Sequence, residues 1–214
     1  MATFVKSRDK GRIGGLFGAP SASQDEVLPW SRTQQAAFLI YMGITVRDAV
    51  KNVQAEWAKE IRNLERVTDN ANRSGDDPAF SSSVSLLTAD VGIRGLLYVT
   101  NDLCSLESGK LALEKWTTND SAEPDPASIT AAVKSLPKAA AGKFLQRIAA
   151  HLGQFDWRSS AAPGLTLDEI TVRKALRGSG GYREMRRLLL EHLAKAKDDV
   201  GPSARAALKT LKLS

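Results

Sequence analysis

Cysteine and histidine are scarce in this sequence of 214 residues, which has one cysteine, Cys104, and two histidines, His151 and His192. A single cysteine excludes an internal disulfide and is typical of a reducing compartment. These three residues lie on separate predicted elements, so they are a weak donor set for zinc, and we expect no metal site. Because Cys104 lies on an apolar segment, we expect a core residue rather than a nucleophile.

Long hydrophobic runs are absent as well: the longest, residues 36–42, is far below the roughly 18–20 residues that span a membrane. No stretch alternates as a half-buried strand does. The sequence also lacks a phosphate-binding glycine motif, HExxH, CxxC and any pair of carboxylates isolated in an apolar setting. We therefore expect a cytoplasmic protein away from the membrane, without catalytic residues, cofactor or enzymatic activity.

What is present is helical periodicity throughout the chain, which predicts an all-α fold, an irregular bundle of about seven to nine helices. Ser31 and Gln34 form a capping-box pattern, S/T-x-x-E/Q, before a helix that we expect to end at Gly43. A second helix is expected to follow, with apolar residues at helical spacing over residues 46–64. Asp125 followed by Pro126 predicts a further helix start.

The segment at residues 86–103 is almost continuously apolar, and we expect a helix through it that starts near Asp90. Gly92 and Gly95 fall inside this helix. They lower its intrinsic stability but permit another helix to pack closely against it.

Residues 1–28 are interpreted as a flexible basic arm, and residues 29–214 as a single helical domain with a basic helical hairpin at 166–196. The arm could become ordered on a partner, or it could be a frayed terminus or the start of a fragment. We expect order to begin at Trp30.

The hairpin at residues 166–196 combines helix ends with clustered positive charge. Thr166 and Glu169 form a second capping-box pattern, residues 178–181 (GSGG) are expected to end the first helix, and a second helix should start at about Tyr182. Residues 166–214 contain 11 Lys and Arg against 6 Asp and Glu, whereas the rest of the chain is nearly balanced. A clustered excess of this kind favours a polyanionic partner.

Phosphate contact is the functional interpretation of this hairpin, because helix N-termini, glycine turns and arginine forks all suit phosphate. The candidate nucleic-acid-binding residues are Arg173, Lys174, Arg177, Gly180, Gly181, Arg183, Arg186 and Arg187. The alternative is a helical hairpin with a solvated basic face and a glycine cap.

The segments FDWRSSAAPGLT (155–166) and ALRGSGGYREMRRLLLEHL (175–193) resemble the C-terminal helical region of the DGQHR-domain proteins. LLTADVGIRGLLYVTNDL (86–103) resembles it more loosely. That family is related to the DndB-like proteins of bacterial DNA-modification islands, and the resemblance implies a DNA-linked context. The Asp-Gly-Gln-His-Arg motif does not occur in this sequence, so no activity associated with it is carried over.

Two functional hypotheses follow. The first is a non-enzymatic DNA-associated accessory or regulatory subunit of a bacterial DNA-modification or antiviral defence system, with nucleic acid and other subunits as partners. The second is a helical scaffold for protein–protein interaction in a larger complex, without nucleic-acid contact. Tryptophans are enriched at interface hot spots and would serve the scaffold, although core packing explains them equally well. They are Trp30, Trp57, Trp116 and Trp157.

Overall fold

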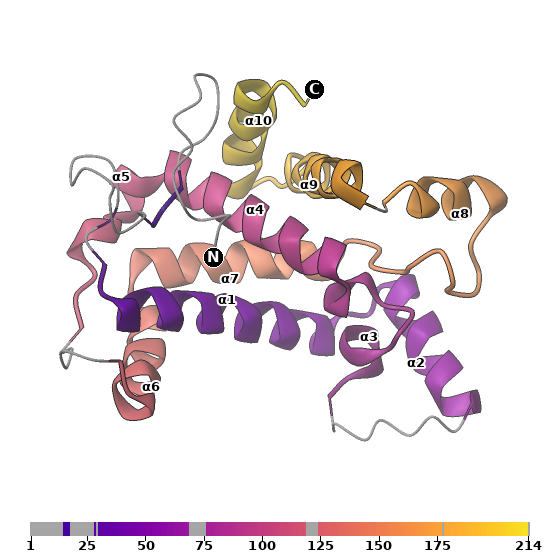
Figure 1. Ribbon diagram of the computed structural model, residues 1–214, viewed down its shortest axis with the longest axis horizontal. Helices are drawn as coiled ribbons and strands as arrows, with labels where there is room; N and C mark the ends of the chain where they lie inside the picture. Colours follow the sequence, from indigo (N-terminus) through magenta and orange to yellow (C-terminus); the bar gives the residue numbers. More distant parts are fainter. Residues whose placement is uncertain are drawn as a thin grey trace.

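A computed structural model shows an all-α protein, as the sequence predicts (Figure 1). It describes residues 15–17, 28, 30–68, 76–118, 124–176 and 178–213. Within these ranges there are ten α-helices, slightly more than expected, and three 3₁₀ turns. The helices are α1 (Arg32–Asn52), α2 (Glu56–Thr68), α3 (Pro78–Ser81), α4 (Asp90–Leu106), α5 (Ser108–Leu111), α6 (Pro126–Ser135), α7 (Ala140–Gly153), α8 (Leu167–Lys174), α9 (Gly178–Leu193) and α10 (Val200–Leu211). The 3₁₀ turns are η3 (Leu86–Thr88), η4 (Leu113–Lys115) and η5 (Leu136–Lys138).

Two helix pairs form the centre of the fold. Helix α1 packs along α7, and α4 packs along α9 (Figure 1). Helix α7 also contacts α4, α9 and α10, so that it joins the two pairs. Helix α6 packs on α1, α10 packs on α9, and α2 and α3 pack on each other. Helix α8 lies at the periphery, at the right in Figure 1, and none of its residues is buried.

Helix α1 begins as predicted and ends later than predicted. Both hydrogen bonds of the Ser31–Gln34 capping box are present. The helix continues through Gly43, because its buried face repeats every four residues on both sides of the glycine, at Phe38, Met42, Val46 and Val50. Burial of that face outweighs the cost of about 1 kcal/mol that a glycine imposes on a helix interior.

The chain instead breaks at residues 53–55, before α2, and a distant arginine satisfies the carbonyl groups at this helix end. Arg62 donates from Nη2 to the Val50 carbonyl (2.9 Å) and from Nη1 to the Val53 carbonyl (2.8 Å). Its Nε donates to both oxygens of Asp77 at 3.0 Å. The last carbonyls of a helix lack intrahelical donors, so Arg62 stabilises the break as a C-terminal cap from another helix.

Helix α4 starts at Asp90 and contains both glycines, as expected. A Cβ on Gly95 would lie 2.7 Å from Cγ of Met185, so the absence of a side chain allows α9 to approach α4. The close packing predicted for this glycine is confirmed. Helix α6 also begins as predicted, with Asp125 as its N-cap and Pro126 in its first turn.

The core takes in residues that the sequence analysis assigned to the arm or to interfaces. Leu16 and Phe17 are 3% and 2% exposed, so buried structure precedes Trp30. All four tryptophans are buried, and therefore none of them marks an exposed hot spot. Cys104 is buried as expected, and burial raises the pKa of its thiol.

Among the described residues, no helix is both long and apolar enough to cross a membrane.

Candidate functional site: the α8–α9 hairpin

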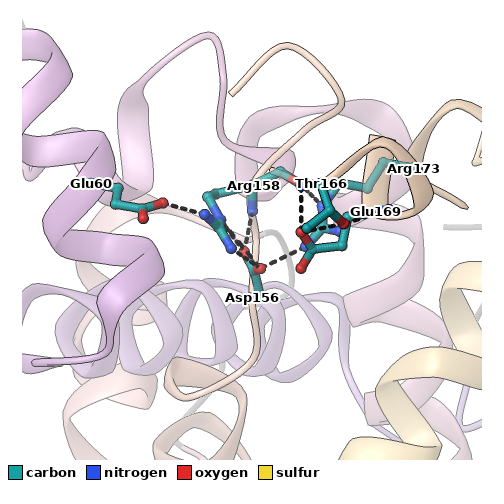
Figure 2. A network of polar contacts seen from close by, with 6 residues as sticks. All are labelled: Glu60, Asp156, Arg158, Thr166, Glu169 and Arg173. Atoms are coloured by element: carbon teal, nitrogen blue, oxygen red, sulfur yellow. Dashed lines mark hydrogen bonds and ion pairs between the residues drawn. The ribbon is translucent and has the colours of Figure 1, made fainter. Parts of the chain in front are cut away.

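The predicted basic hairpin consists of α8 and α9, and its first arginine binds the body of the protein. Arg173 donates from Nε to the Arg158 carbonyl oxygen (2.7 Å) and from Nη2 to Oδ2 of Asp156 (2.6 Å) (Figure 2). Its side chain is only 12% exposed. Arg173 is therefore already occupied by an intramolecular carboxylate.

Arg158 continues this network toward α2. It donates to Asp156 through Nε and Nη2 and pairs with Glu60 through Nη1 (Figure 2). Burial alone would raise the pKa of Asp156, but the hydrogen bonds from Arg158 and the charge of Arg173 hold it below its ordinary value. We call Glu60, Asp156, Arg158 and Arg173 the α8 network. It connects α2, the loop after α7, and α8 by polar contacts.

Gly164, in the loop before α8, adjoins this network. Its φ of +74° is left-handed, and a Cβ there would lie 2.8 Å from a carboxylate oxygen of Glu60. Glycine is the residue that adopts this conformation without strain. The loop therefore changes direction beside Glu60 and leads directly into the N-terminus of α8.

Helix α8 begins with the predicted capping box, in which Thr166 and Glu169 exchange hydrogen bonds. The hydrogen bonds from Thr166 lower the pKa of Glu169.

The predicted break at residues 178–181 is wrong, because α8 ends at Lys174 and α9 already starts at Gly178. The GSGG segment therefore forms the first turn of α9. Gly181 is buried there: a Cβ would lie 2.4 Å from the carbonyl carbon of Leu176, so a larger residue would separate the two helices.

Arg186 lies in the α4–α9 contact and binds a fully buried carboxylate. Its Nε donates to Oδ2 of Asp102 at 2.6 Å, and its Nη2 donates to Oδ1. Asp102 is 0% exposed, whereas the Arg186 side chain is 20% exposed. Burial raises the pKa of Asp102, although the hydrogen bonds from Arg186 act to lower it. A forked pair of this kind orients one helix on the other.

The remaining candidates divide into paired and free groups. Arg187 bridges Glu184 and Glu191 on its own helix. Lys174 and Arg183 are exposed and make no hydrogen bond or ion pair with any described residue. Gly180 is exposed with open space around it, whereas Gly181 is buried. Arg177 lies outside the described residues.

An arginine–tyrosine ladder along the α4–α9 contact was not predicted from the sequence. On α4, Asp90, Arg94, Tyr98 and Asp102 follow one another at intervals of four residues and share a face. Arg94 lies 4.8 Å from the ring centre of Tyr182, and Arg186 lies 5.1 Å from that of Tyr98. The Tyr182 hydroxyl also donates to Asp90 (2.5 Å). Each helix thus supplies one arginine and one tyrosine to two reciprocal cation–π contacts.

Two of the carboxylates that engage the arginines were missed because they come from distant parts of the sequence. Asp102 lies 84 residues before Arg186, and Glu60 lies 98 residues before Arg158. One signal was available: Asp102 is an acidic residue within the largely apolar stretch at residues 95–104, where burial of a carboxylate requires a partner.

The fold and this site together define an all-α protein with a basic hairpin, in which α9 packs into the core and α8 is attached through arginine–carboxylate contacts. Comparison with protein-family models, with curated proteins and with solved structures finds no match for this chain. The described residues contain no group of three or more His, Cys, Asp or Glu side chains arranged to hold a metal ion.

Proposed function

We propose that the protein is a cytoplasmic, non-enzymatic DNA-associated accessory or regulatory subunit of a bacterial DNA-modification or defence system. It contacts DNA phosphates through the α8–α9 hairpin and works beside other protein subunits. The resemblance of residues 155–193 to the DGQHR-domain proteins supports the biological context, and the charge of the hairpin supports the contact with DNA.

The observation that carries this proposal is the division of the hairpin's cations. Arg173, Arg186 and Arg187 are neutralised by carboxylates of the same chain. Lys174, at the end of α8, and Arg183, in α9, are exposed and unpaired among the described residues. Free cations attract phosphate, whereas an arginine within an ion pair would first have to give up its partner.

Neighbouring features of the C-terminal region support the same partner. Gly180 exposes the backbone in the first turn of α9, at the positive end of the helix dipole, where an anion can approach. The loop after α9, helix α10 and the C-cap of α10 expose further lysines: Lys195, Lys197, Lys209 and Lys212. These exposed side chains add to the positive charge of the C-terminal region, and an excess of this kind favours a polyanion over a single phosphate group.

The test is a titration with duplex and with single-stranded DNA at several salt concentrations. We expect Lys174→Ala/Arg183→Ala to weaken binding and to reduce the slope of log K against log salt by about two, roughly one unit per lost phosphate contact. The control, Lys134→Ala/Lys138→Ala, removes the same charge from exposed positions in and beside α6. Absence of binding at low salt, or an equal loss in the control, would contradict the proposal.

The second candidate function is a protein–protein scaffold, and a different observation now favours it. The buried tryptophans no longer support it, but α8 leaves Leu167 83% exposed and Val172 49% exposed. A photo-crosslinking residue at position 167 tests this function inside cells. Crosslinks to one protein from position 167, and none from the exposed position 143 on α7, would favour the scaffold.

A further inference from the structure

Residues 15–17 (Gly-Leu-Phe) occupy the core as a short non-helical segment with a bend at Leu16, held by residues that are far away in sequence. Leu16 donates its backbone N–H to Oδ1 of Asn101 (3.0 Å), 85 residues further on. Its carbonyl accepts from the backbone N–H of Leu28 (3.2 Å). Phe17 places its ring against Trp30, with the ring centres 5.7 Å apart, and edge-on to Phe38 at 6.2 Å. Both side chains are almost completely buried.

We call Trp30, Phe38 and Asn101 the seat of this segment. The seat is held together by contacts that do not involve residues 15–17. The Trp30 indole donates to the Leu113 carbonyl (2.9 Å), and its ring packs edge-on against Trp116 at 5.0 Å. The seat should therefore keep its shape when the segment leaves.

Neighbouring bonds fix the same region. Gln34 donates its side-chain amide to the carbonyl of Trp116 and closes the capping box with Ser31. Phe38 of α1 packs against Trp30, which precedes the helix, with ring centres 5.2 Å apart. These contacts tie the N-terminus of α1 to the segment after α5, again without residues 15–17.

We infer that this seat is a peptide-binding site, filled in the intact chain by Leu16 and Phe17, whose ligand in trans is a peptide segment of a partner protein with consecutive Leu and Phe. The segment shows the features of a bound peptide. Two adjacent side chains supply the anchors, and the buried side-chain amide of Asn101 accepts a hydrogen bond from the backbone N–H of the first anchor, Leu16. Backbone pairing combined with side-chain pockets is a general mode of peptide recognition.

The sequence around the anchors supports this assignment. Gly14, Gly15 and Gly18 flank them and contribute no side chains to a core. A segment that is merely part of the core would be expected to add apolar residues at a regular period, as α1 and α4 do. Because the segment is attached to its own seat, its effective concentration there is in the millimolar range, and a free peptide competes only when the segment is released.

The experiment lets the protein fold with the segment in place and only afterwards cuts the chain between the segment and the rest of the domain. A protease recognition sequence is inserted between Ala22 and Ser23, the full-length chain is folded, and the purified protein is then cleaved. Binding of a fluorescent peptide with the sequence of residues 12–19 is followed by anisotropy. We expect saturable binding to the cleaved protein, and binding to the uncut protein that is roughly tenfold or more weaker.

Two matched controls define the recognition. A peptide with Ser in place of Phe17 should not bind, and Asn101→Leu in the cleaved protein should weaken the native peptide. Full-length Phe17→Ser is a second route to an unfilled seat, and it should bind the native peptide without cleavage.

Two results would overturn the inference. Loss of the helical circular-dichroism signal on cleavage would show that the seat requires its occupant, as an ordinary core does. Retention of the fold without binding of the native peptide would show that the seat does not accept the segment in trans. Either result is independent of DNA binding, which is tested at other residues.

Discussion

The α4–α9 contact and the α8 network both rest on arginine–carboxylate bonds, but they differ in what surrounds those bonds. In the first, Asp102 is fully buried and the apolar side chain of Met185 packs against the backbone of α4 at Gly95. In the second, Asp156 and Glu60 keep 29% of their side-chain surface exposed, and no residue of α8 is buried. The same chemical bond therefore belongs to a packed core in one place and attaches a peripheral helix in the other.

This difference determines how each contact contributes to stability. A buried ion pair carries a large desolvation cost, so the loss of one partner leaves an uncompensated charge in the core. A partly exposed network can exchange its protein partners for water at lower cost. We expect changes at the α4–α9 contact to affect global unfolding, and changes in the α8 network to release α8 locally.

The largest effect is predicted for Arg186→Met, which leaves the Asp102 carboxylate buried without its partner. We expect the free energy of unfolding at pH 7 to fall by about 3–5 kcal/mol. Urea unfolding followed by circular dichroism measures it. A loss below about 1 kcal/mol would mean that water reaches Asp102.

The double variant Arg186→Met/Asp102→Asn is the control for this prediction, and it should recover part of the lost stability because it removes the buried charge. A pH signature is expected as well. Burial raises the pKa of Asp102 in the folded state, so the charged form opposes folding and stability is lost as pH rises above the ordinary value of 3.8. The deficit of Arg186→Met relative to the native protein should therefore shrink when the pH is lowered from neutral toward that value.

Gly95→Ala comes next and tests the apolar part of the same contact. The added Cβ would meet Cγ of Met185 at 2.7 Å, so α9 has to shift, and we expect a loss of about 1–3 kcal/mol. Gly43→Ala is the matched control, because no atom lies within 4 Å of its Cβ position. It should stabilise α1 by up to about 1 kcal/mol. Thermal unfolding of both variants gives the comparison, and equal effects would contradict it.

Arg173→Met tests the α8 network. We expect α8 to lose about 1–2 kcal/mol of local protection, which lies toward the low end for hydrogen bonds to charged groups because Asp156 is partly exposed. Hydrogen–deuterium exchange of residues 167–174 measures it, and the global urea midpoint should change little. The control is Lys174→Met, the neighbouring residue without a partner among the described residues. Global destabilisation as large as that of Arg186→Met would remove the distinction between the two regions.

The smallest effect concerns His192 at the other end of α9, where its Nε2 lies 2.9 Å from the His151 carbonyl oxygen. Burial lowers the pKa of His192 below its ordinary value of 6.5, and the bond to this carbonyl only partly opposes the shift. As the pH falls through that value, the unfolded chain binds the proton first, so stability decreases. His192→Gln should flatten this decrease by less than about 1 kcal/mol between pH 7.5 and 5.5, as measured by urea midpoints. An unchanged profile would contradict the shift.

Local sequence signals predicted much of the fold, because they depend on neighbouring residues. The capping boxes at Ser31 and Thr166 and the start of α6 at Asp125 are confirmed. The predictions at Gly43 and at residues 178–181 were wrong, since both treated glycine as a helix end. In α1 a continuous buried face carries the helix through Gly43, and in α9 the GSGG segment forms the first turn.

The candidate site was predicted less completely than the fold. The concentration of positive charge in residues 166–214 is visible in the sequence. Which cations are free is not visible, because Arg173 and Arg186 find their carboxylates 17 and 84 residues away. The list of eight candidates is therefore reduced to Lys174 and Arg183 as free cations among the described residues.

The helical class, several helix starts and the basic character of the C-terminal quarter follow from periodicity, capping and composition, and are therefore encoded locally. The partners of the arginines, the burial of Leu16 and Phe17 and the close approach of α4 and α9 arise only in the folded protein. The two groups differ in the range of the interactions involved, because a cap or an amphipathic face is encoded within a few residues. The partner of a buried charge or an anchoring side chain depends on which distant segments the packed core brings together.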